Sequence, residues 1–263
     1  MDRTWGNVDL KIDGLNINYE IDGAGKDVLI LHGWGANIDT VRPIINGLKA
    51  TKRVIAFDFA GFGKSDVPKK DLTVQDYMEM TVDFMHRLGL SKTDIICHSF
   101  GGRVTILLAA KYPELVGKIV FCDAAGVRKK RTLSYYAKIG GYKLCKKIAK
   151  VRWLKKCANA LGVDVDKRIK NAGSADYKDL PMEMKKTFIN VVNEDLKKYL
   201  KKISAPSLLI WGENDLDTPV YMGKIFENEI KDAGLVVLKN AGHYAYLDQY
   251  AQFMAIINQF LGK

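Results

Sequence analysis

A serine lies between a short apolar run and a helical pattern, which is a placement that suits a nucleophile. The run is Asp94-Ile-Ile-Cys97, and a helical pattern begins directly after Ser99. A serine in such a strand–turn–helix stands on a sharp elbow, with its hydroxyl exposed at the carboxyl edge of the sheet. Gly101 provides the small residue that the turn needs on one side, and Cys97, where glycine is usual, is still small. The pattern predicts that Ser99 is a nucleophile, and the alternative is an ordinary strand-to-helix turn.

A serine hydroxyl is a weak nucleophile at neutral pH and needs a general base, for which histidine is the natural side chain. The chain has four histidines. His98 adjoins the serine, so its side chain should point away from the hydroxyl, and His86 falls within a helical pattern. His32 ends the first buried strand. His243 lies in a loop after the last strand, from which it can reach Ser99, and we expect it to be the base.

The base must in turn be oriented by a carboxylate, which should also follow a strand. Asp215 comes shortly after the apolar run 207–211, within Trp-Gly-Glu-Asn-Asp. Glu213 and Asp217 are neighbouring competitors, and Asp123, which follows an earlier strand, is a third. Any of them could instead be a surface or helix-capping carboxylate. We expect Asp215 to be the acid.

Attack on a carbonyl produces an oxyanion that needs two preorganised hydrogen-bond donors. The backbone N–H of Phe100 is one candidate, because it lies at the start of a helix, where the helix dipole favours negative charge. The turn 32–35, His-Gly-Trp-Gly, can supply the second donor through the N–H of Trp34. The alternative for this turn is a glycine-rich loop without a catalytic role.

The elements that must position these residues alternate between short apolar runs and helical patterns. The runs expected to be strands are 8–12, 15–21, 27–31, 53–57, 94–97, 118–122, 207–211 and 235–238. The helical patterns between and after them are 40–48, 74–88, 100–112 and 253–260. Thr73 suits the N-cap of the second helix, and Asp13-Gly14 suits a turn between the first two strands. The alternation predicts an α/β protein with a mostly parallel sheet flanked by helices on both faces.

The segment 127–202 interrupts this alternation, because it contains no clear buried strand and its pattern is that of several amphipathic helices. We expect it to be a helical cap inserted into a core made of residues 1–126 and 203–263. Its charge sets it apart. Residues 128–202 contain 22 Lys or Arg against 7 Asp or Glu, a net of +15, whereas the rest of the chain carries a net of −4.

Three interpretations of this basic segment remain open. It can be a solvated helical surface, it can attract an anionic substrate, or it can dock loosely on an anionic membrane. For a membrane, Tyr135, Tyr136, Tyr142 and Trp153 would be interfacial anchors. Nucleic acid is not expected as a partner, because no recognition motif accompanies the lysines.

The composition excludes several other classes of protein. Hydrophobic residues are 48% and charged residues 27%, which is an ordinary globular balance. No apolar run of about 18 residues is present and the N-terminus has no signal pattern, so we expect a cytoplasmic protein without stable membrane insertion. The cysteines, at 97, 122, 145 and 157, form no C-x-x-C pair and indicate neither a zinc site nor a disulfide framework. No metal and no cofactor are called for.

Taken together, the motifs resemble those of the α/β-hydrolase superfamily, in its serine-nucleophile, helical-cap type. The matching segments occur in the family's order between about residues 8 and 261, and they are 32–35, 58–65, 97–101, 211–215 and 242–243. The resemblance implies these roles, position by position: nucleophile Ser99, base His243, acid Asp215, and backbone oxyanion donors Trp34 and Phe100. It also implies a helical cap inserted after the strand that ends near Cys122. The 58–65 segment resembles a structural turn and is given no catalytic role.

The expected function is that of a serine hydrolase that cleaves a carboxylic ester or thioester through an acyl-enzyme. The partner would be a small ester or acyl compound, with an anionic group as one option. Two alternatives stay open: a carbon–carbon bond hydrolase or lyase on the same triad, and a non-catalytic ligand receptor on a hydrolase scaffold. Relatives with an aspartate nucleophile, such as dehalogenases and epoxide hydrolases, are disfavoured by the serine at position 99. The sequence carries no signal for an oligomeric state.

Overall fold

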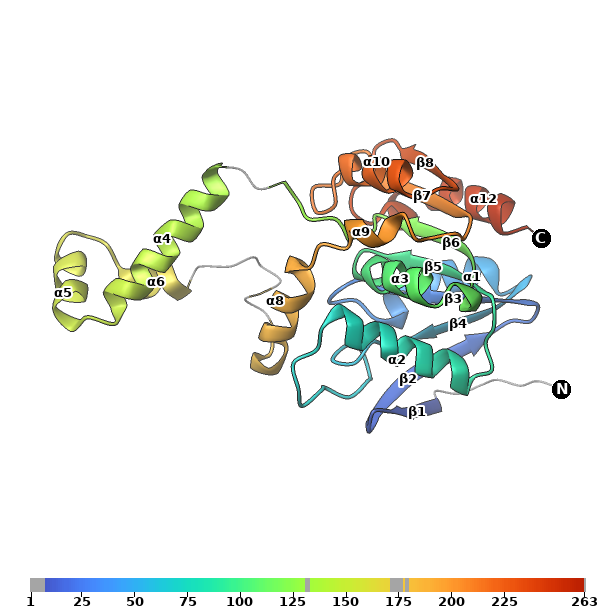
Figure 1. Ribbon diagram of the computed structural model, residues 1–263, viewed down its shortest axis with the longest axis horizontal. Coiled ribbons are helices and arrows are strands. Elements are labelled where there is room, and N and C mark those ends of the chain that lie inside the picture. Colours follow the sequence, from blue (N-terminus) through green and yellow to red (C-terminus); the bar gives the residue numbers. More distant parts are fainter. Residues whose placement is uncertain (1–7, 131–132, 171–176, 178–179, 263) are drawn as a thin grey trace. The chain divides into compact units, whose positions relative to one another are not determined.

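The structure is a computed structural model that describes residues 8–130, 133–170, 177 and 180–262 of the 263. The chain divides into two compact units. Unit 1 comprises Met1–Arg128 and Met182–Lys263, and unit 2 comprises Lys129–Pro181. Unit 1 is built around a β-sheet, whereas unit 2 is helical in its described part (Figure 1).

In the described part of the chain, unit 1 contains one eight-stranded sheet with the order β1-β2-β4-β3-β5-β6-β7-β8. Its strands are β1 (Val8–Ile12), β2 (Leu15–Asp22), β3 (Lys26–Leu31), β4 (Lys52–Phe57), β5 (Thr93–His98), β6 (Val116–Cys122), β7 (Ser207–Gly212) and β8 (Ala233–Leu238). The β1–β2 and β2–β4 pairs are antiparallel, and all other neighbours are parallel. The prediction of an α/β protein with a mostly parallel sheet is therefore confirmed.

The first two strands form the expected hairpin. Ile12 and Leu15 face each other across the turn, whose central residues Asp13 and Gly14 have φ of 49° and 78°. Two successive residues with positive φ make the type of two-residue turn whose twist matches that of paired strands. The Asp-Gly sequence suits this turn because both residue types tolerate the left-handed region.

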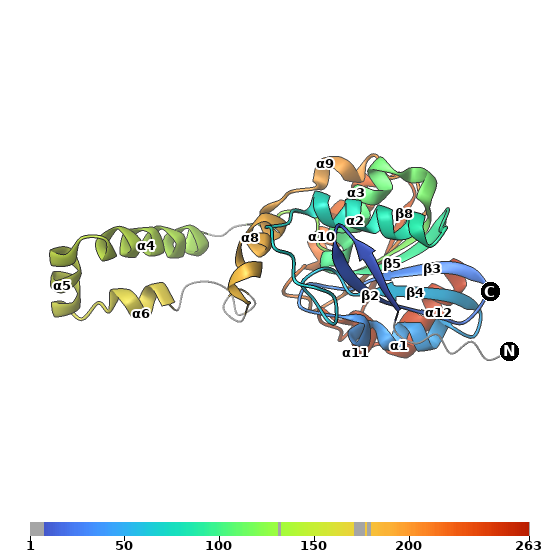
Figure 2. The ribbon, with the colours of Figure 1, turned by 90° about the horizontal axis from the view of Figure 1, so that it is seen from below.

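Helices cover both faces of the sheet. Those of unit 1 are α1 (Ile38–Leu48), α2 (Val74–Arg87), α3 (Phe100–Lys111), α8 (Lys185–Asn193), α9 (Lys197–Leu200), α10 (Val220–Glu229), α11 (Ala245–Asp248) and α12 (Tyr250–Leu261), with 3-10 turns at Pro113–Leu115 and Met182–Met184. Figure 2 shows α1 and α12 on one face and α2 and α3 on the other, and each pair is in contact. A strand in such a sheet is buried on both sides, which is why the parallel strands are continuous apolar runs.

The central strand β5 is fixed from both faces of the sheet. All six of its residues are buried. On one face Ile96 belongs to a core cluster that also contains Ile44 of α1 and Phe253 of α12. On the other side of the sheet, Phe100 of α3 packs against Tyr77 of α2 with ring centroids 5.0 Å apart. The carboxyl end of β5, where the candidate serine lies, therefore has little freedom to move.

Helix α2 begins with the predicted cap. The Thr73 side chain accepts a hydrogen bond from the N–H of Asp76 at 3.2 Å, and the Asp76 carboxylate accepts one from the N–H of Thr73 at 2.7 Å. This reciprocal pair is a capping box, which satisfies two backbone donors that the first turn of a helix leaves free. The helix ends at Arg87 with Leu88 as its C-cap, and Gly89, which follows, has a φ of 63° that suits the left-handed position after a helix.

Unit 2 consists, where described, of three helices that contact one another: α4 (Leu133–Ala149), α5 (Arg152–Ala160) and α6 (Val165–Lys170). Cys145 and Val165 are buried between them. The insertion expected from the sequence, 127–202, includes all of unit 2 and also α8 and α9, which belong to unit 1. In the part of the chain that the structure describes, no helix is long and apolar enough to span a bilayer.

Hydrogen bonds within unit 1 hold the segment that follows α8. The buried guanidinium of Arg103 on α3 donates to the carbonyl of Glu194, which follows α8, at 2.7 Å. The N–H of Leu196 donates to the carbonyl of Gly126 at 2.8 Å, and the Arg128 side chain donates to the carbonyl of Asn193 at 2.9 Å. The segment 126–128, which precedes unit 2, is thus hydrogen-bonded to the segment 193–196, at and after the end of α8.

Candidate active site

Ser99 occupies a strained turn between β5 and α3. Its φ and ψ are 46° and −110°, a conformation that costs a residue other than glycine on the order of 1–3 kcal/mol. The Ser99 N–H donates to the carbonyl of Cys122 at 3.2 Å, and the Ser99 carbonyl accepts from the N–H groups of Gly102 and Ala125, both at 2.9 Å. The end of β6 and the loop after it therefore hold the serine in place.

Close packing around the turn explains which residue types it accepts. A Cβ atom on Gly101 would lie 2.3 Å from the carbonyl oxygen of Leu31, so only glycine fits there. Cys97, on the other side of the serine, is fully buried in β5, and its Sγ lies 3.6 Å from the carbonyl oxygen of Val120. Burial raises the pKa of the Cys97 thiol to about 12, so this thiol stays protonated and unreactive.

Three residues from separate elements meet at the serine. His243 Nε2 lies 3.0 Å from Ser99 Oγ, and His243 Nδ1 lies 2.9 Å from Asp215 Oδ2. Ser99 follows β5, Asp215 follows β7 and His243 follows β8, so all three lie at the carboxyl edge of the sheet. The structure therefore brings together the three residues that the sequence singled out as nucleophile, base and acid.

The electrostatics of the pair Asp215–His243 set the protonation state of each side chain. Burial alone would raise the pKa of Asp215, but hydrogen bonds from His243 and Thr218 outweigh it and bring the pKa to about 2. Burial opposes a charge on His243, yet the hydrogen bond and the charge of Asp215 raise its pKa above 6.5. Asp215 is therefore ionised and accepts the Nδ1–H, which leaves the Nε2 lone pair facing the Ser99 hydroxyl.

The rival carboxylates near Asp215 serve other purposes. Asp217 is exposed, and its backbone N–H donates to Asp215 Oδ1 at 2.8 Å, which shapes the turn. Glu213 is also exposed and accepts from the N–H of Asn240 at 3.3 Å. Ligand atoms of Asp215, Asp217 and His243 lie within 4.8 Å of one another, a spacing that could hold a metal ion. His243 Nδ1, however, is already the hydrogen-bond partner of Asp215.

Asp123, the third rival carboxylate, connects the segments that carry Asp215 and His243. One oxygen accepts from the N–H of Gly212 at 2.8 Å, and the other accepts from the N–H of Ala245 at 3.0 Å. The Thr218 hydroxyl lies 2.9 Å from the Asp123 carbonyl oxygen and 2.7 Å from Asp215 Oδ2. The Asp123 side chain is buried, and burial raises its pKa to about 7. Asp123 is a bridge between loops rather than the partner of the histidine.

His98 is a residue that the sequence reasoning set aside. Its Nε2 donates to the backbone carbonyl of His243 at 2.7 Å. Among the described residues its Nδ1 has no hydrogen-bond partner, and burial lowers the pKa of His98 to about 3, so the ring is neutral. The contact joins residues 145 positions apart. No local pattern could have predicted it.

The turn after β3 is held by a second neutral histidine. The N–H of Ala36 donates to the carbonyl of Gly33 at 3.3 Å, and Gly35, with φ of 71°, takes the position of this turn that favours glycine. His32 Nδ1 lies 2.7 Å from the carbonyl oxygen of Gly33, and His32 Nε2 accepts a hydrogen bond from the N–H of Phe59 at 3.0 Å. Burial lowers the pKa of His32 to about 4, so it is a structural residue here.

The two candidate oxyanion donors flank the serine. A Cβ atom on Gly33 would lie 3.3 Å from the Ser99 Cβ, so the backbone just before Trp34 runs directly against the serine. Phe100 is the first residue of α3, and its N–H therefore has no acceptor one turn earlier in the helix. The rings of these two residues are in edge contact, with centroids 5.4 Å apart.

Aromatic side chains form an apolar surface beside the turn. The Trp34 ring contacts Phe62 at 4.8 Å and Phe188 of α8 at 5.2 Å between centroids. Phe62 belongs to the 58–65 segment, in which the buried Asp58 accepts hydrogen bonds from the N–H groups of Ile38 and Lys64. This segment is organised as a structural turn that supports the aromatic surface.

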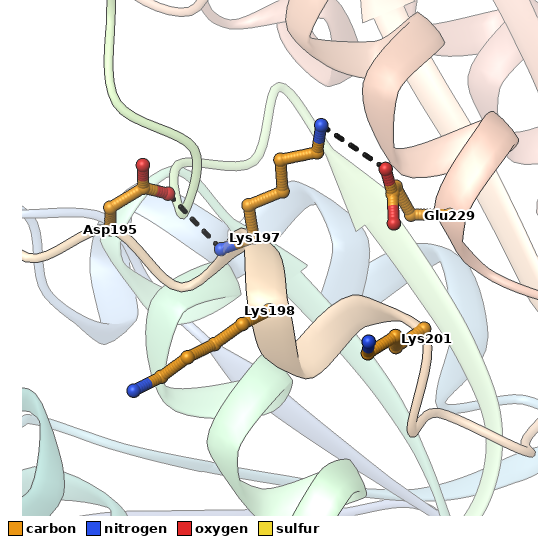
Figure 3. Close-up of a pocket in the computed structure, with 5 residues that line it drawn as sticks. All are labelled: Asp195, Lys197, Lys198, Lys201 and Glu229. Atoms are coloured by element: carbon orange, nitrogen blue, oxygen red, sulfur yellow. Dashed lines mark hydrogen bonds and ion pairs between the residues drawn. The ribbon is translucent and has the colours of Figure 1, made fainter.

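A separate hollow of about 360 Å³ contains none of these residues (Figure 3). It is lined by Asp195, Lys197, Lys198, Lys201 and Glu229. Lys197 Nζ lies 3.1 Å from Glu229 Oε1, and the Lys197 N–H donates to Asp195 at 3.1 Å. Because its charges are partly compensated by each other and lie at the surface, this hollow has the character of a solvated groove.

Comparison with known proteins agrees with this geometry. Residues 27–250 match the sequence model of the α/β hydrolase fold. The chain is 28% identical to the uncharacterized hydrolase YugF of Bacillus subtilis, over 88% of this chain and 89% of that one. It is 27% identical to the pimeloyl-[acyl-carrier protein] methyl ester esterase of Neisseria meningitidis, over 90% and 94% of the two chains.

Two further similarities complete the comparison. The chain is 25% identical to the 2-hydroxy-6-oxononadienedioate/2-hydroxy-6-oxononatrienedioate hydrolase of Paraburkholderia phymatum, over 95% of this chain and 92% of that one. Among solved structures, the bromoperoxidase of Bacillus anthracis superposes with a TM-score of 0.76 at 23% identity, over 97% and 99% of the two chains. The structural similarity supports the fold.

The buried carboxylate of Asp123 leads to a prediction about stability. Asp123→Asn retains the size of the side chain but places an NH₂ group opposite one of two backbone donors, so the variant should be less stable. The pKa of Asp123 is about 7 in the folded protein, above the unfolded value of about 3.9. The wild-type protein therefore loses stability as pH rises through about 7. The asparagine of the variant does not titrate, so the variant does not lose this stability. The Tm difference between the two proteins should therefore narrow between pH 5 and pH 8.

Thermal unfolding, monitored by circular dichroism, measures the difference in Tm. In a chain of this size, each kcal/mol of stability shifts Tm by roughly 2–4 °C. Asp232→Asn, at an exposed site, is the control and should leave Tm within about 1 °C of the wild type at each pH. A difference that widens as pH rises would contradict the assignment of a raised pKa to Asp123.

Proposed function

Because this chain belongs to the α/β-hydrolase fold family, we propose that it is a serine hydrolase that cleaves a carboxylic ester or thioester. The observation that supports the proposal is the unbroken hydrogen-bonded series from Ser99 Oγ through the His243 ring to Asp215, with distances of 3.0 Å and 2.9 Å. Such a series activates a hydroxyl that is otherwise a weak nucleophile.

In the first half of the proposed reaction, His243 Nε2 takes the hydroxyl proton as Ser99 Oγ attacks the carbonyl carbon. The resulting oxyanion accepts hydrogen bonds from the backbone N–H groups of Trp34 and Phe100. His243 then gives the proton to the leaving alcohol or thiol as its bond to the carbonyl carbon breaks. The acyl group remains bonded to Ser99 Oγ.

In the second half, water takes the place of the alcohol. His243 removes a proton from the water, whose oxygen attacks the acyl carbon, and then returns that proton to Ser99 Oγ as the acyl–oxygen bond breaks. The products are a carboxylic acid and the regenerated enzyme. Asp215 stabilises the charge that His243 carries in both halves, without being protonated itself.

Several residues act by holding this arrangement. Asp123 ties the loop of Asp215 to that of His243, and His98 holds the backbone of His243 itself. A catalytic hydrogen bond loses much of its effect when its partners shift by about 1 Å. We infer that Asp123 and His98 are positioning residues.

The class of substrate rests on two considerations. The aromatic surface of Trp34, Phe62 and Phe188 suits an apolar acyl chain, and similarity to an enzyme named as a methyl ester esterase supports an ester. Similarity to a hydrolase of 2-hydroxy-6-oxo dienedioates supports a second candidate, hydrolysis of a carbon–carbon bond next to a ketone, on the same three residues. We favour the ester, because it requires nothing beyond the nucleophile, the base and the oxyanion donors.

The nucleophile can be identified with a fluorophosphonate probe, which forms a stable bond to an activated serine. Intact-mass analysis should show one adduct on the wild-type protein and none on Ser99→Ala. Ser65→Ala is the matched control, since Ser65 is a buried serine of the structural turn, and it should still be labelled. Labelling that persists in Ser99→Ala would sink the assignment, and an unlabelled wild type would favour the non-catalytic receptor.

The bond that is cleaved can be tested with a panel of aryl esters of increasing acyl length and a matched set of vinylogous β-diketones. We expect kcat/KM at least about tenfold higher for the best ester than for the best diketone, with a preference for medium or long acyl chains. Product identification by chromatography separates alcohol release from carbon–carbon cleavage. If the best diketone has the higher kcat/KM, hydrolysis of a carbon–carbon bond replaces ester hydrolysis as the proposed reaction.

The role of Asp215 has a signature in the pH profile. The base must be neutral, so kcat/KM should fall on the acid side with an apparent pKa above 6.5, because Asp215 raises the pKa of His243. Asp215→Asn should lower kcat by about 10⁴-fold, as the loss of an orienting acid does elsewhere, and should move the acid limb to lower pH. Asp217→Asn is the control, with kcat within about threefold of the wild type. If the acid side of the pH profile stays at the same pH in Asp215→Asn, Asp215 is not the partner of the base.

A further inference from the structure

The net charge of the chain resides in unit 2. Residues 129–181 contain 15 Lys or Arg against 4 Asp or Glu, a net of +11, which equals the net charge of the entire chain. The rest of the chain is balanced, with 26 basic and 26 acidic residues. A positive charge confined to one small helical unit indicates a local role, because solubility alone does not require such separation.

Helix α5 carries an exposed apolar stripe. Trp153, Cys157 and Leu161 are spaced by four residues and so lie on one face. The Trp153 side chain is 66% exposed, that of Leu161 is 83% exposed, and Cys157 is exposed as well. No residue of α5 is fully buried. These three apolar side chains are therefore largely exposed to solvent.

Basic side chains border the stripe. Arg152 and Lys156, one turn apart on α5, are exposed, and so is Lys150 between α4 and α5. Lys155, in contrast, forms an ion pair with Asp166 at 2.6 Å and holds α5 to α6. The charges of Arg152, Lys156 and Lys150 are thus exposed, whereas that of Lys155 is paired within the unit.

Bulky apolar side chains ringed by cations match the interfacial region of an anionic bilayer. There the indole of a tryptophan and a leucine side chain lie near the boundary between headgroups and acyl chains, and lysine and arginine contact phosphates. Nucleic acid would use the cations but would leave Leu161 in water. We propose that α5, with the adjoining end of α4, docks unit 2 on the surface of a bilayer that contains anionic phospholipid.

In this arrangement Trp153 and Leu161 enter the headgroup boundary, and Lys150, Arg152 and Lys156 contact lipid phosphates. Each basic residue near the surface contributes about 1 kcal/mol of attraction, which falls with ionic strength. Binding is peripheral and reversible, because a single short helix buries too little apolar surface for insertion. The side chains of Tyr135 and Tyr136, two of the anchors expected from the sequence, lie outside the described residues.

The test is co-sedimentation of the full chain with large vesicles. We expect the protein to pellet at low salt with vesicles of phosphatidylcholine that contain one-third phosphatidylglycerol, and to remain in the supernatant with phosphatidylcholine alone or at about 0.5 M salt. Arg152→Glu/Lys156→Glu and Trp153→Ala should each weaken binding by about tenfold or more. Because these side chains are exposed, the variants should keep the Tm of the wild type.

Matched controls lie on unit 1. Lys231→Glu/Lys239→Glu removes the same number of exposed basic residues, and Met182→Ala removes a side chain that is 77% exposed. Both should bind vesicles within about twofold of the wild type. A wild type that stays in solution at low salt would overturn the proposal, and so would controls that weaken binding as much as the α5 variants.

Three further outcomes also overturn the proposal. If Trp153→Ala binds vesicles normally while the charge variants do not, the attraction is purely electrostatic and no docking face exists. Tighter binding to a single-stranded oligonucleotide than to vesicles, unchanged in Trp153→Ala, would make the unit a nucleic-acid surface. If Trp153→Ala lowers Tm by several degrees and the wild type ignores vesicles, the stripe packs against another part of the chain. None of these measurements depends on turnover at Ser99.

Discussion

Two hydrogen bonds to one buried carboxylate connect the segments that carry Asp215 and His243, the partners of Ser99 in the hydrogen-bonded series. Asp123 receives the N–H of Gly212 from one loop and that of Ala245 from another, and these loops carry Asp215 and His243. The two segments follow the neighbouring strands β7 and β8, and backbone hydrogen bonds from Glu213 to Leu238 at 3.0 Å and from Asn214 to Ala241 at 2.8 Å also join them. A carboxylate offers a separate acceptor oxygen to each of the two donors, whereas the side-chain amide of asparagine has a single acceptor oxygen.

The histidines show how surroundings assign different tasks to one residue type. His32 and His98 are buried among backbone groups and aromatic rings, which lowers the pKa of both and leaves them as neutral hydrogen-bonding elements. His243 has a carboxylate as its partner, which raises its pKa and suits it to accept a proton. His32 hydrogen-bonds to the backbone of Gly33 and Phe59, and His98 to the backbone of His243, whereas His243 has the raised pKa that suits a proton acceptor.

The sequence predicted those features that local patterns determine. The eight strands, the Asp13-Gly14 turn and the cap at Thr73 follow from residue types within a few positions of one another. The grouping of Ser99 with His243 and Asp215 followed from placing each at a strand end, which is enough because the strands that carry them, β5, β7 and β8, run parallel. The roles of Asp123 and His98 could not be predicted in this way. Their partners are 89 to 145 residues distant, and only the folded chain brings them together.

The bond between Gly126 and Leu196 has a consequence for how such a chain can diversify. Because the outgoing and returning segments are joined to each other and to Arg103, the ends of everything between them are held by unit 1. The cost of closing a loop grows only slowly with its length, so the intervening segment can lengthen, shorten or be exchanged at small cost to the core. Unit 2 can therefore be replaced during evolution, so that new surface chemistry arises while Ser99, His243 and Asp215 keep their geometry.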